Sequence, residues 1–141
     1  MSALRHVPAH MSDDVGVYRR WFYAAAVYNL AWGSAVAIFP SRFLRLAGIT
    51  DANAVPLAQV IAMMVAVYGY GYYLLARDPH RYCGLIWVGL AGKTLGPLGF
   101  IVSAAAGALP WSFGWICVFN DVIWWPIFWK FALVYGRTPL R

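Results

Sequence analysis

Charged residues are scarce in this chain, and their scarcity is the first constraint on its class. Of its 141 residues only 11% are charged, whereas 62% are hydrophobic and 18% are aromatic. Soluble domains carry roughly 25% charged residues, more than twice this fraction. The apolar residues also fall in long blocks instead of periodic stripes, which is typical of membrane spans. The composition therefore excludes an ordinary soluble domain.

Metal-binding and catalytic patterns are lacking too. Cys83 and Cys117 form no CxxC motif and have no histidine at a metal-ligand spacing. They fall at different depths of the expected spans, so we expect no disulfide between them. His6, His10 and His80 all lie outside the apolar blocks, which argues against a haem held by two intramembrane histidines. Without a nucleophile–base pair, a metal-ligand set or a phosphate loop, the sequence predicts no catalytic residue and no metal, and leaves any other cofactor open.

A basic run is absent, although the net charge is +6, so we expect no nucleic-acid partner. The arginines lie instead at the ends of apolar blocks, where they determine membrane topology. An inside N-terminus leaves only Arg42 and Arg45 outside. The cytoplasmic side then holds Arg5, Arg19, Arg20, Arg77, Arg81, Arg137 and Arg141, and Lys130 can snorkel to it. We therefore predict a multi-pass protein of the bacterial inner (cytoplasmic) membrane with both termini in the cytoplasm.

Four apolar blocks follow a polar N-terminal tail at residues 1–16, in which Met11 is an alternative start. The expected spans cover residues 21–39, 55–76, 82–106 and 111–135, and a short tail at 137–141 ends the chain. The short turns make successive spans antiparallel neighbours. The fold class we predict is an all-α, integral membrane four-helix bundle over residues 17–136. Residues 41–48 read as an interfacial helix, either a lid over a site or a surface connector.

The few strongly polar residues of the spans fall at one depth. Lys93 lies eleven residues into the third span, roughly 16 Å from its cytoplasmic end. Asp121 lies ten residues into the fourth, roughly 15 Å from its outer end. In a hydrocarbon core of about 30 Å both are near the centre, and Asn29 of the first span reaches a similar level. The other members of this polar midplane are Asn120, Thr94 and Tyr68. We predict a Lys93–Asp121 pair in the bundle interior, since an intramembrane charge needs a partner.

Two prolines stand beside this pair. Pro97 has no N–H group, so the carbonyl of Lys93 loses its helical partner, and Pro126 does the same to the carbonyl of Val122. Interrupted helices expose such carbonyls to a ligand or ion in transporters. The alternative is that the prolines only kink the spans and that neighbouring groups bond the freed carbonyls.

Small and aromatic residues surround the pair in sequence. Gly89, Gly92, Gly96 and Gly99 follow a 3-4-3 spacing that includes a GxxxG step, which predicts close helix packing. The aromatic and methionine side chains at helical spacing predict either a pocket wall for a flat lipophilic ligand or plain helix packing. The predicted wall consists of Trp32, Met63, Tyr70, Trp124, Trp125 and Phe128.

The segments Tyr28–Gly33, Gly92–Phe100 and Asn120–Trp125 resemble a family of small four-span bacterial membrane proteins. The resemblance covers residues from about 17 to 136. It implies an architecture and no catalytic roles. In outline the chain is also similar to DoxX-like four-span proteins, some of which are associated with membrane quinone chemistry.

Three functions remain open. The first is binding of a lipophilic small molecule, such as a quinone or another isoprenoid, at the level of Asn29, Lys93 and Asp121. The second is a structural subunit or assembly factor of a larger membrane complex or homo-oligomer, in which the pair is a structural clasp. The third is proton-coupled export of a small molecule, which ranks last because Lys93 would neutralise the carboxylate. In each case membrane lipid surrounds the protein, and no feature favours an enzyme.

Overall fold

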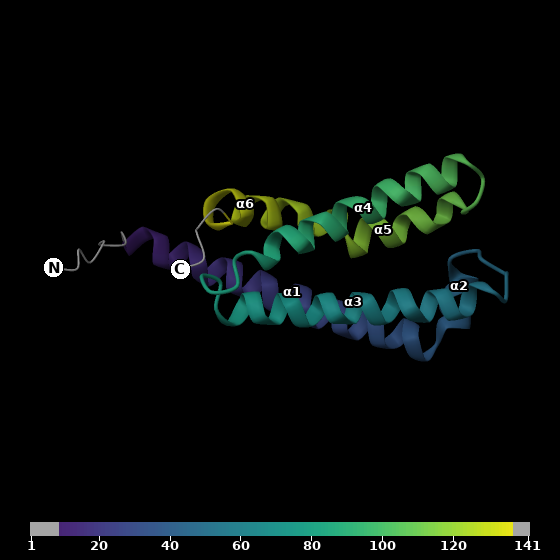
Figure 1. The fold of residues 1–141 in the computed structure, drawn as a ribbon, viewed down its shortest axis with the longest axis horizontal. Coiled ribbons are helices and arrows are strands. Elements are labelled where there is room, and N and C mark those ends of the chain that lie inside the picture. The colour runs from purple at the N-terminus through teal and green to yellow at the C-terminus, as the bar shows by residue number, and fades with distance from the viewer. Residues whose placement is uncertain (1–8, 137–141) are drawn as a thin grey trace.

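A computed structural model describes the backbone from residue 9 to residue 136 and the side chains from residue 15. This part of the chain is all-helical, as predicted (Figure 1). Its elements are α1 (Ala9–Ile38), α2 (Pro40–Leu46), α3 (Ala54–Arg77), α4 (Leu85–Ala105), η1 (Trp111–Phe113), α5 (Gly114–Asn120), η2 (Val122–Trp124) and α6 (Trp125–Tyr135). The C-terminal tail and residues 1–8 of the predicted N-terminal tail lie outside the described residues, and the tail's residues 9–16 are helical.

Three helical segments are long and apolar enough to cross a membrane: α3, α4 and the run Trp111–Tyr135, which comprises η1, α5, η2 and α6. A fourth span exists if α1 and α2 are counted together, although α2 turns away from α1 by 101°. Many of their large apolar side chains face outward, as a surrounding bilayer requires. The structure therefore has the character of a membrane-embedded protein.

The helices form two layers. In the first, α1 and α3 pack side by side along most of their length. Two glycines permit this close contact: a Cβ atom at Gly33 would lie 2.6 Å from the carbonyl oxygen of Ala62, and one at Gly69 would lie 3.0 Å from that of Ala26. The backbones of α1 and α3 thus meet directly, as small residues allow in membrane helices.

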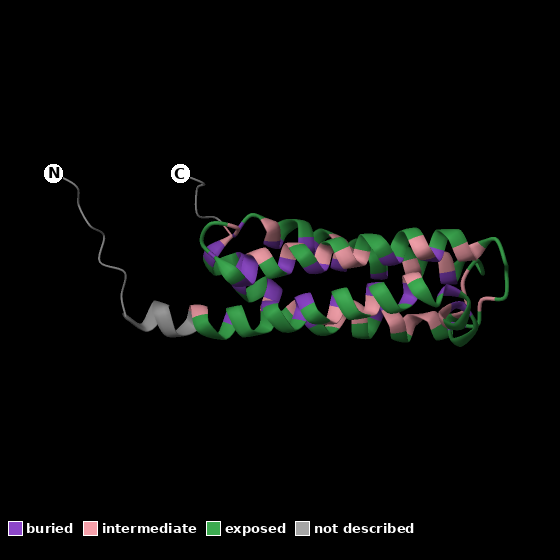
Figure 2. Cartoon of the chain, turned by 90° about the horizontal axis from the view of Figure 1, so that it is seen from below, coloured by how far each residue is buried: buried purple, intermediate pink, exposed green. Residues whose placement is uncertain are grey.

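The second layer consists of α4 packed against α5 and α6. It joins the first layer near α6, where five fully buried side chains form the centre of the core. These are Phe22, Leu75, Ile86, Phe128 and Phe131. Toward the α2 end the layers diverge, and the buried residues become sparser (Figure 2). The functional candidate lies in that diverging half.

Candidate functional site: a cavity ending at Lys93 and Asp121

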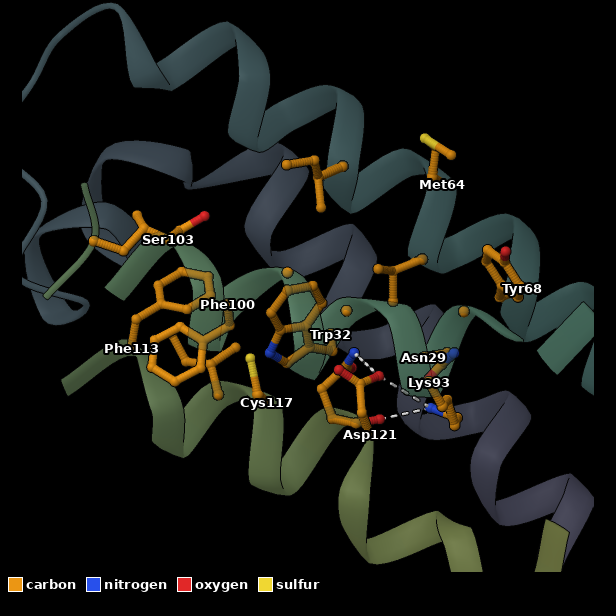
Figure 3. Close-up of a pocket in the computed structure, with 18 of the residues that line it drawn as sticks. Asn29, Trp32, Met64, Tyr68, Lys93, Phe100, Ser103, Phe113, Cys117 and Asp121 are labelled. Atoms are coloured by element: carbon orange, nitrogen blue, oxygen red, sulfur yellow. Dashed lines mark hydrogen bonds and ion pairs between the residues drawn. The ribbon is translucent and has the colours of Figure 1, made fainter. Parts of the chain in front are cut away.

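A cavity of about 460 Å³ lies between the two layers. Residues of α1, α3, α4 and α5 line it, and apolar side chains dominate its surface (Figure 3). Its charged and amide side chains gather at one end, in Asn29, Lys93, Asn120 and Asp121, and Ser103 lies toward the other end. An apolar chamber with a few convergent polar groups is the usual form of a small-molecule site.

Lys93 is 97% buried, with only 3% of its surface exposed, and the nearest group to its ammonium is a backbone carbonyl. Nζ donates a hydrogen bond of 2.6 Å to the carbonyl oxygen of Asn120, and it lies 3.7 Å from Oδ1 of Asp121. The structure thus brings Lys93 and Asp121 together, but adds a third group that the sequence did not indicate.

A break in the fourth span makes that carbonyl available. Asp121 departs from helical geometry, with φ −123° and ψ −58°, so α5 ends at Asn120. The N–H of Trp124, which would bond the Asn120 carbonyl in a continuous helix, instead donates to Asp121 at 3.2 Å. The free Asn120 carbonyl is therefore turned to Lys93.

The carbonyls freed by the two prolines are both bonded by Trp125. Its indole Nε1 donates to the carbonyl of Lys93 at 3.1 Å, and its backbone N–H donates to that of Val122. Consequently α4 runs unbroken through Pro97, contrary to the expected interruption. Pro126 stands in the first turn of α6, a position where its missing N–H costs nothing. The interruption of the fourth span occurs at Asp121, five residues before that proline.

Three aromatic rings surround the Lys93 ammonium, and one of them, Tyr72, also lines the cavity. The Nζ atom of Lys93 lies 5.5 Å from the ring centre of Tyr72 and 5.9 Å from those of Trp124 and Phe128. Ring faces at this distance attract a cation. Trp124, Trp125 and Phe128, predicted as cavity wall, therefore lie behind the polar end and do not line the cavity itself.

Two side-chain oxygens at the polar end have no hydrogen-bond partner among the described residues, Oδ1 of Asn29 and Oδ1 of Asn120. Asn29 is only 2% exposed. Asn120 donates through Nδ2 to Oδ1 of Asp121 at 2.9 Å, which fixes the orientation of its amide. Buried polar groups of this kind normally have a partner, so a ligand that reaches this end would be bonded there. A third such atom, Nε1 of Trp124, does not belong to the cavity lining.

The glycine stripe of α4 divides into two halves. Tyr72 packs over Gly89 and Tyr68 over Gly92, so ring contacts replace the expected helix contact there. Gly96 faces the Asp121 carboxylate, and a Cβ at Gly99 would meet nothing within 4 Å. These last two glycines line the cavity and are exposed.

The second span presents a different face from the expected one. Met63 and Tyr70 do not line the cavity, whereas Met64, which is 57% exposed, and Tyr68 do. Both faces of α3 are apolar, so the sequence pattern alone did not distinguish them, and the approach of α1 to Gly69 decides the orientation. Thr94 lies outside the lining, and Trp32 belongs to it as predicted.

The outer end of the cavity is covered by α2, close to the predicted interfacial segment. The ring of Phe43 packs 5.2 Å from Trp32 and 6.5 Å from Phe113. Ser112 also donates a hydrogen bond of 3.3 Å to the carbonyl of Ala47. These contacts join α2 to η1 at the end opposite Lys93.

Compared with protein-family models, curated proteins and solved structures, the chain matches none of them. The resemblance to four-span and DoxX-like proteins accordingly stays a prediction. Within residues 15–136, where side chains are described, no group of three or more His, Cys, Asp or Glu side chains could hold a metal ion. The site must be interpreted from its own geometry.

Proposed function

We propose that this chain is a four-span inner-membrane protein, with both termini in the cytoplasm, that binds a lipophilic small molecule in the cavity. The ligand's polar head lies against Asn29, Asn120 and Asp121, and its apolar part extends toward Phe100 and Phe113. A quinone-like or isoprenoid compound has this form.

The observation that carries the proposal is the combination of an apolar chamber with unbonded buried amide oxygens at its closed end. A protein that only used the Lys93–Asp121 pair as a clasp would gain nothing from the open volume beside it. An intramembrane ionisable cluster is also a functional-site hypothesis by default. Gly96 and Gly99 line the cavity and are exposed, so a membrane-dissolved compound would have a lateral route to it past these glycines.

A structural role for the pair is the competing proposal. Lys93 of α4 contacts the break between α5 and η2, so it does tie two neighbouring helices together. A buried ion pair contributes little net stability, however, because desolvation offsets the attraction.

Ligand extraction separates the two proposals. The protein is purified in mild detergent, and co-purifying lipids are compared by mass spectrometry between wild type, Lys93→Met and Asp121→Asn. We expect a specific lipophilic compound with the wild type and its loss in both variants. Lys130→Met is the matched control, because Lys130 is exposed on α6 and should leave the compound bound.

The variants' stability decides how a loss is interpreted. Single variants that unfold, together with a stable Lys93→Met/Asp121→Leu double variant, would reject the ligand site in favour of the clasp. The variant Gly99→Trp tests the cavity while leaving Lys93 and Asp121 unchanged. Position 99 has open space beside it, so the added side chain can be accommodated. A folded Gly99→Trp protein that retains the compound contradicts binding in this cavity.

A further inference from the structure

Two amide oxygens at the polar end of the cavity lack a hydrogen-bond donor among the described residues. They are Oδ1 of Asn29 and Oδ1 of Asn120, buried atoms of two residues that line the cavity. The assignment is firm for Asn120, because its Nδ2 donates to Asp121 and its amide cannot be reversed without losing that bond. Oδ2 of Asp121 faces Gly96 on the cavity side and adds a further acceptor.

The strongest donor, the ammonium of Lys93, already interacts with oxygens of the protein. It donates to the Asn120 carbonyl, lies 3.7 Å from Oδ1 of Asp121 and has the ring of Tyr72 at 5.5 Å, and it keeps further N–H groups. One buried cation and one buried anion also balance in charge, so a charged ligand head would leave a net charge in an apolar environment. Such a charge is strongly unfavourable inside a protein or bilayer.

On the basis of the proposed ligand-binding function, we propose that the cavity takes a neutral lipophilic hydroxyl compound. Its O–H group donates to the unbonded oxygen of Asn29 or Asn120, and the hydroxyl oxygen remains able to accept from Lys93. Phenols, quinols and isoprenoid alcohols share this chemistry. An oxidised quinone or an ether offers acceptors only, and would leave the two amide oxygens unbonded.

The shape of the cavity agrees with an apolar tail on that hydroxyl. Between the polar end and α2 the lining includes Trp32, Phe100, Phe113 and Ile116. Exposed Gly96 and Gly99 leave room for a longer chain to leave sideways between α3 and α4. The ligand would therefore have its hydroxyl at the bilayer midplane and its tail toward the outer half.

A pair of probes that differ in one donor tests this inference. 4-Hexylphenol and its methyl ether are titrated against the purified protein in lipid nanodiscs, with binding measured by calorimetry. We expect the phenol to bind about tenfold more tightly, since one hydrogen bond to a buried acceptor is at stake. A short-tailed quinol with its quinone, and a C15 isoprenoid alcohol with its methyl ether, then distinguish the two natural sources of the hydroxyl.

Two variants locate the effect. Asn29→Leu removes the orphan oxygen and should abolish most of the preference for the phenol, while the unfolding temperature of the empty protein stays equal or rises. Gly99→Trp fills the cavity and should weaken both probes, whereas Leu95→Trp on the exposed face of α4 should weaken neither.

The outcomes separate the two proposals. Equal affinity for phenol and ether, with both sensitive to Gly99→Trp, overturns the hydroxyl inference and leaves ligand binding in the cavity standing. Absence of Gly99→Trp-sensitive binding by every probe overturns the proposed function as well. A preference for the phenol that survives Asn29→Leu and Asn120→Leu contradicts the assignment of the donor's partners.

Discussion

At the scale of single residues, the buried lysine is held mainly by the backbone. Its hydrogen bond to the Asn120 carbonyl is 2.6 Å long, whereas the Asp121 carboxylate is 3.7 Å away. A carbonyl partner does not change its charge with conditions, so it fixes the lysine's position independently of Asp121. The carboxylate is left with an oxygen that faces the cavity. Under the proposed function, this division would leave the amide and carboxylate oxygens as the main ligand contacts, with Lys93 held in place by the backbone.

Depth along the spans was enough to predict part of this arrangement. Counting residues placed Lys93, Asp121 and Asn29 at one level, and all three line one end of the cavity. The Asn120 carbonyl could not be predicted, because it becomes free only through the backbone angles of Asp121. Proline positions pointed to a break near Pro126, but the chain leaves the helix five residues earlier.

Trp125 gives a prediction at this scale. Trp125→Phe removes the indole N–H that bonds the Lys93 carbonyl beside Pro97, and that carbonyl is then unsatisfied in an apolar interior. We expect a loss of about 1 kcal/mol in the free energy of unfolding, measured by chemical unfolding in mixed micelles. Trp115→Phe is the control, because Trp115 is exposed and should change stability little. Equal losses in both variants would show that ring size matters and the hydrogen bond does not.

At the scale of helices, two helix backbones approach each other closely at glycines other than the predicted ones. The sequence pattern correctly put Gly89, Gly92, Gly96 and Gly99 on one face of a helix, but spacing does not say what that face meets. Tyrosine rings cover the first two, and the cavity lies before the others. The backbone contacts are at Gly33 and Gly69, which lack a recognisable stripe in the sequence.

Alanine substitutions distinguish these positions. Gly33→Ala would place a methyl group 2.6 Å from the Ala62 carbonyl oxygen in α3, and the two helices would have to separate. We expect a loss of about 1–3 kcal/mol in unfolding free energy. Gly99→Ala meets nothing within 4 Å and should leave stability unchanged or raise it by up to about 1 kcal/mol, because alanine favours the helix. A destabilised Gly99→Ala with a tolerant Gly33→Ala would contradict the described packing of α1 on α3.

At the scale of the whole molecule, the cavity results from how the two layers meet. They are joined near α6 by a dense core, and at the other end by the contacts of α2 with η1. Between these two junctions α4 offers glycines instead of side chains, so the volume stays open. The sequence predicted the helices and their order, but not this volume, since it depends on the divergence of two layers that are each well packed.

The packing of the two layers also brings the arginine-rich ends of α1 and α3 close to the end of α6. Tyr18 near the start of α1 packs 5.8 Å from Tyr135 at the end of α6, and Arg19 donates to the carbonyl of Ala76 at the end of α3. Arg42 and Arg45 lie on α2, at the opposite end. Among the described residues, Arg19, Arg20, Arg77 and Arg81 thus lie at one end of the molecule, and from this distribution the positive-inside rule predicts that this end faces the cytoplasm.

Reporter fusions test this orientation. Alkaline phosphatase, which folds to an active form only outside the cytoplasm, is fused after Arg81 or Arg141, and after Ala52 or Gly107. We expect activity from the Ala52 and Gly107 fusions, because these turns follow α2 and α4 at the arginine-poor end, and none from the other two. A cytoplasmically active reporter at the same four sites should give the reverse pattern. Phosphatase activity after Arg81 or Arg141 would show that the protein has the opposite orientation in the membrane. The open side of the cavity would then face the inner half of the bilayer.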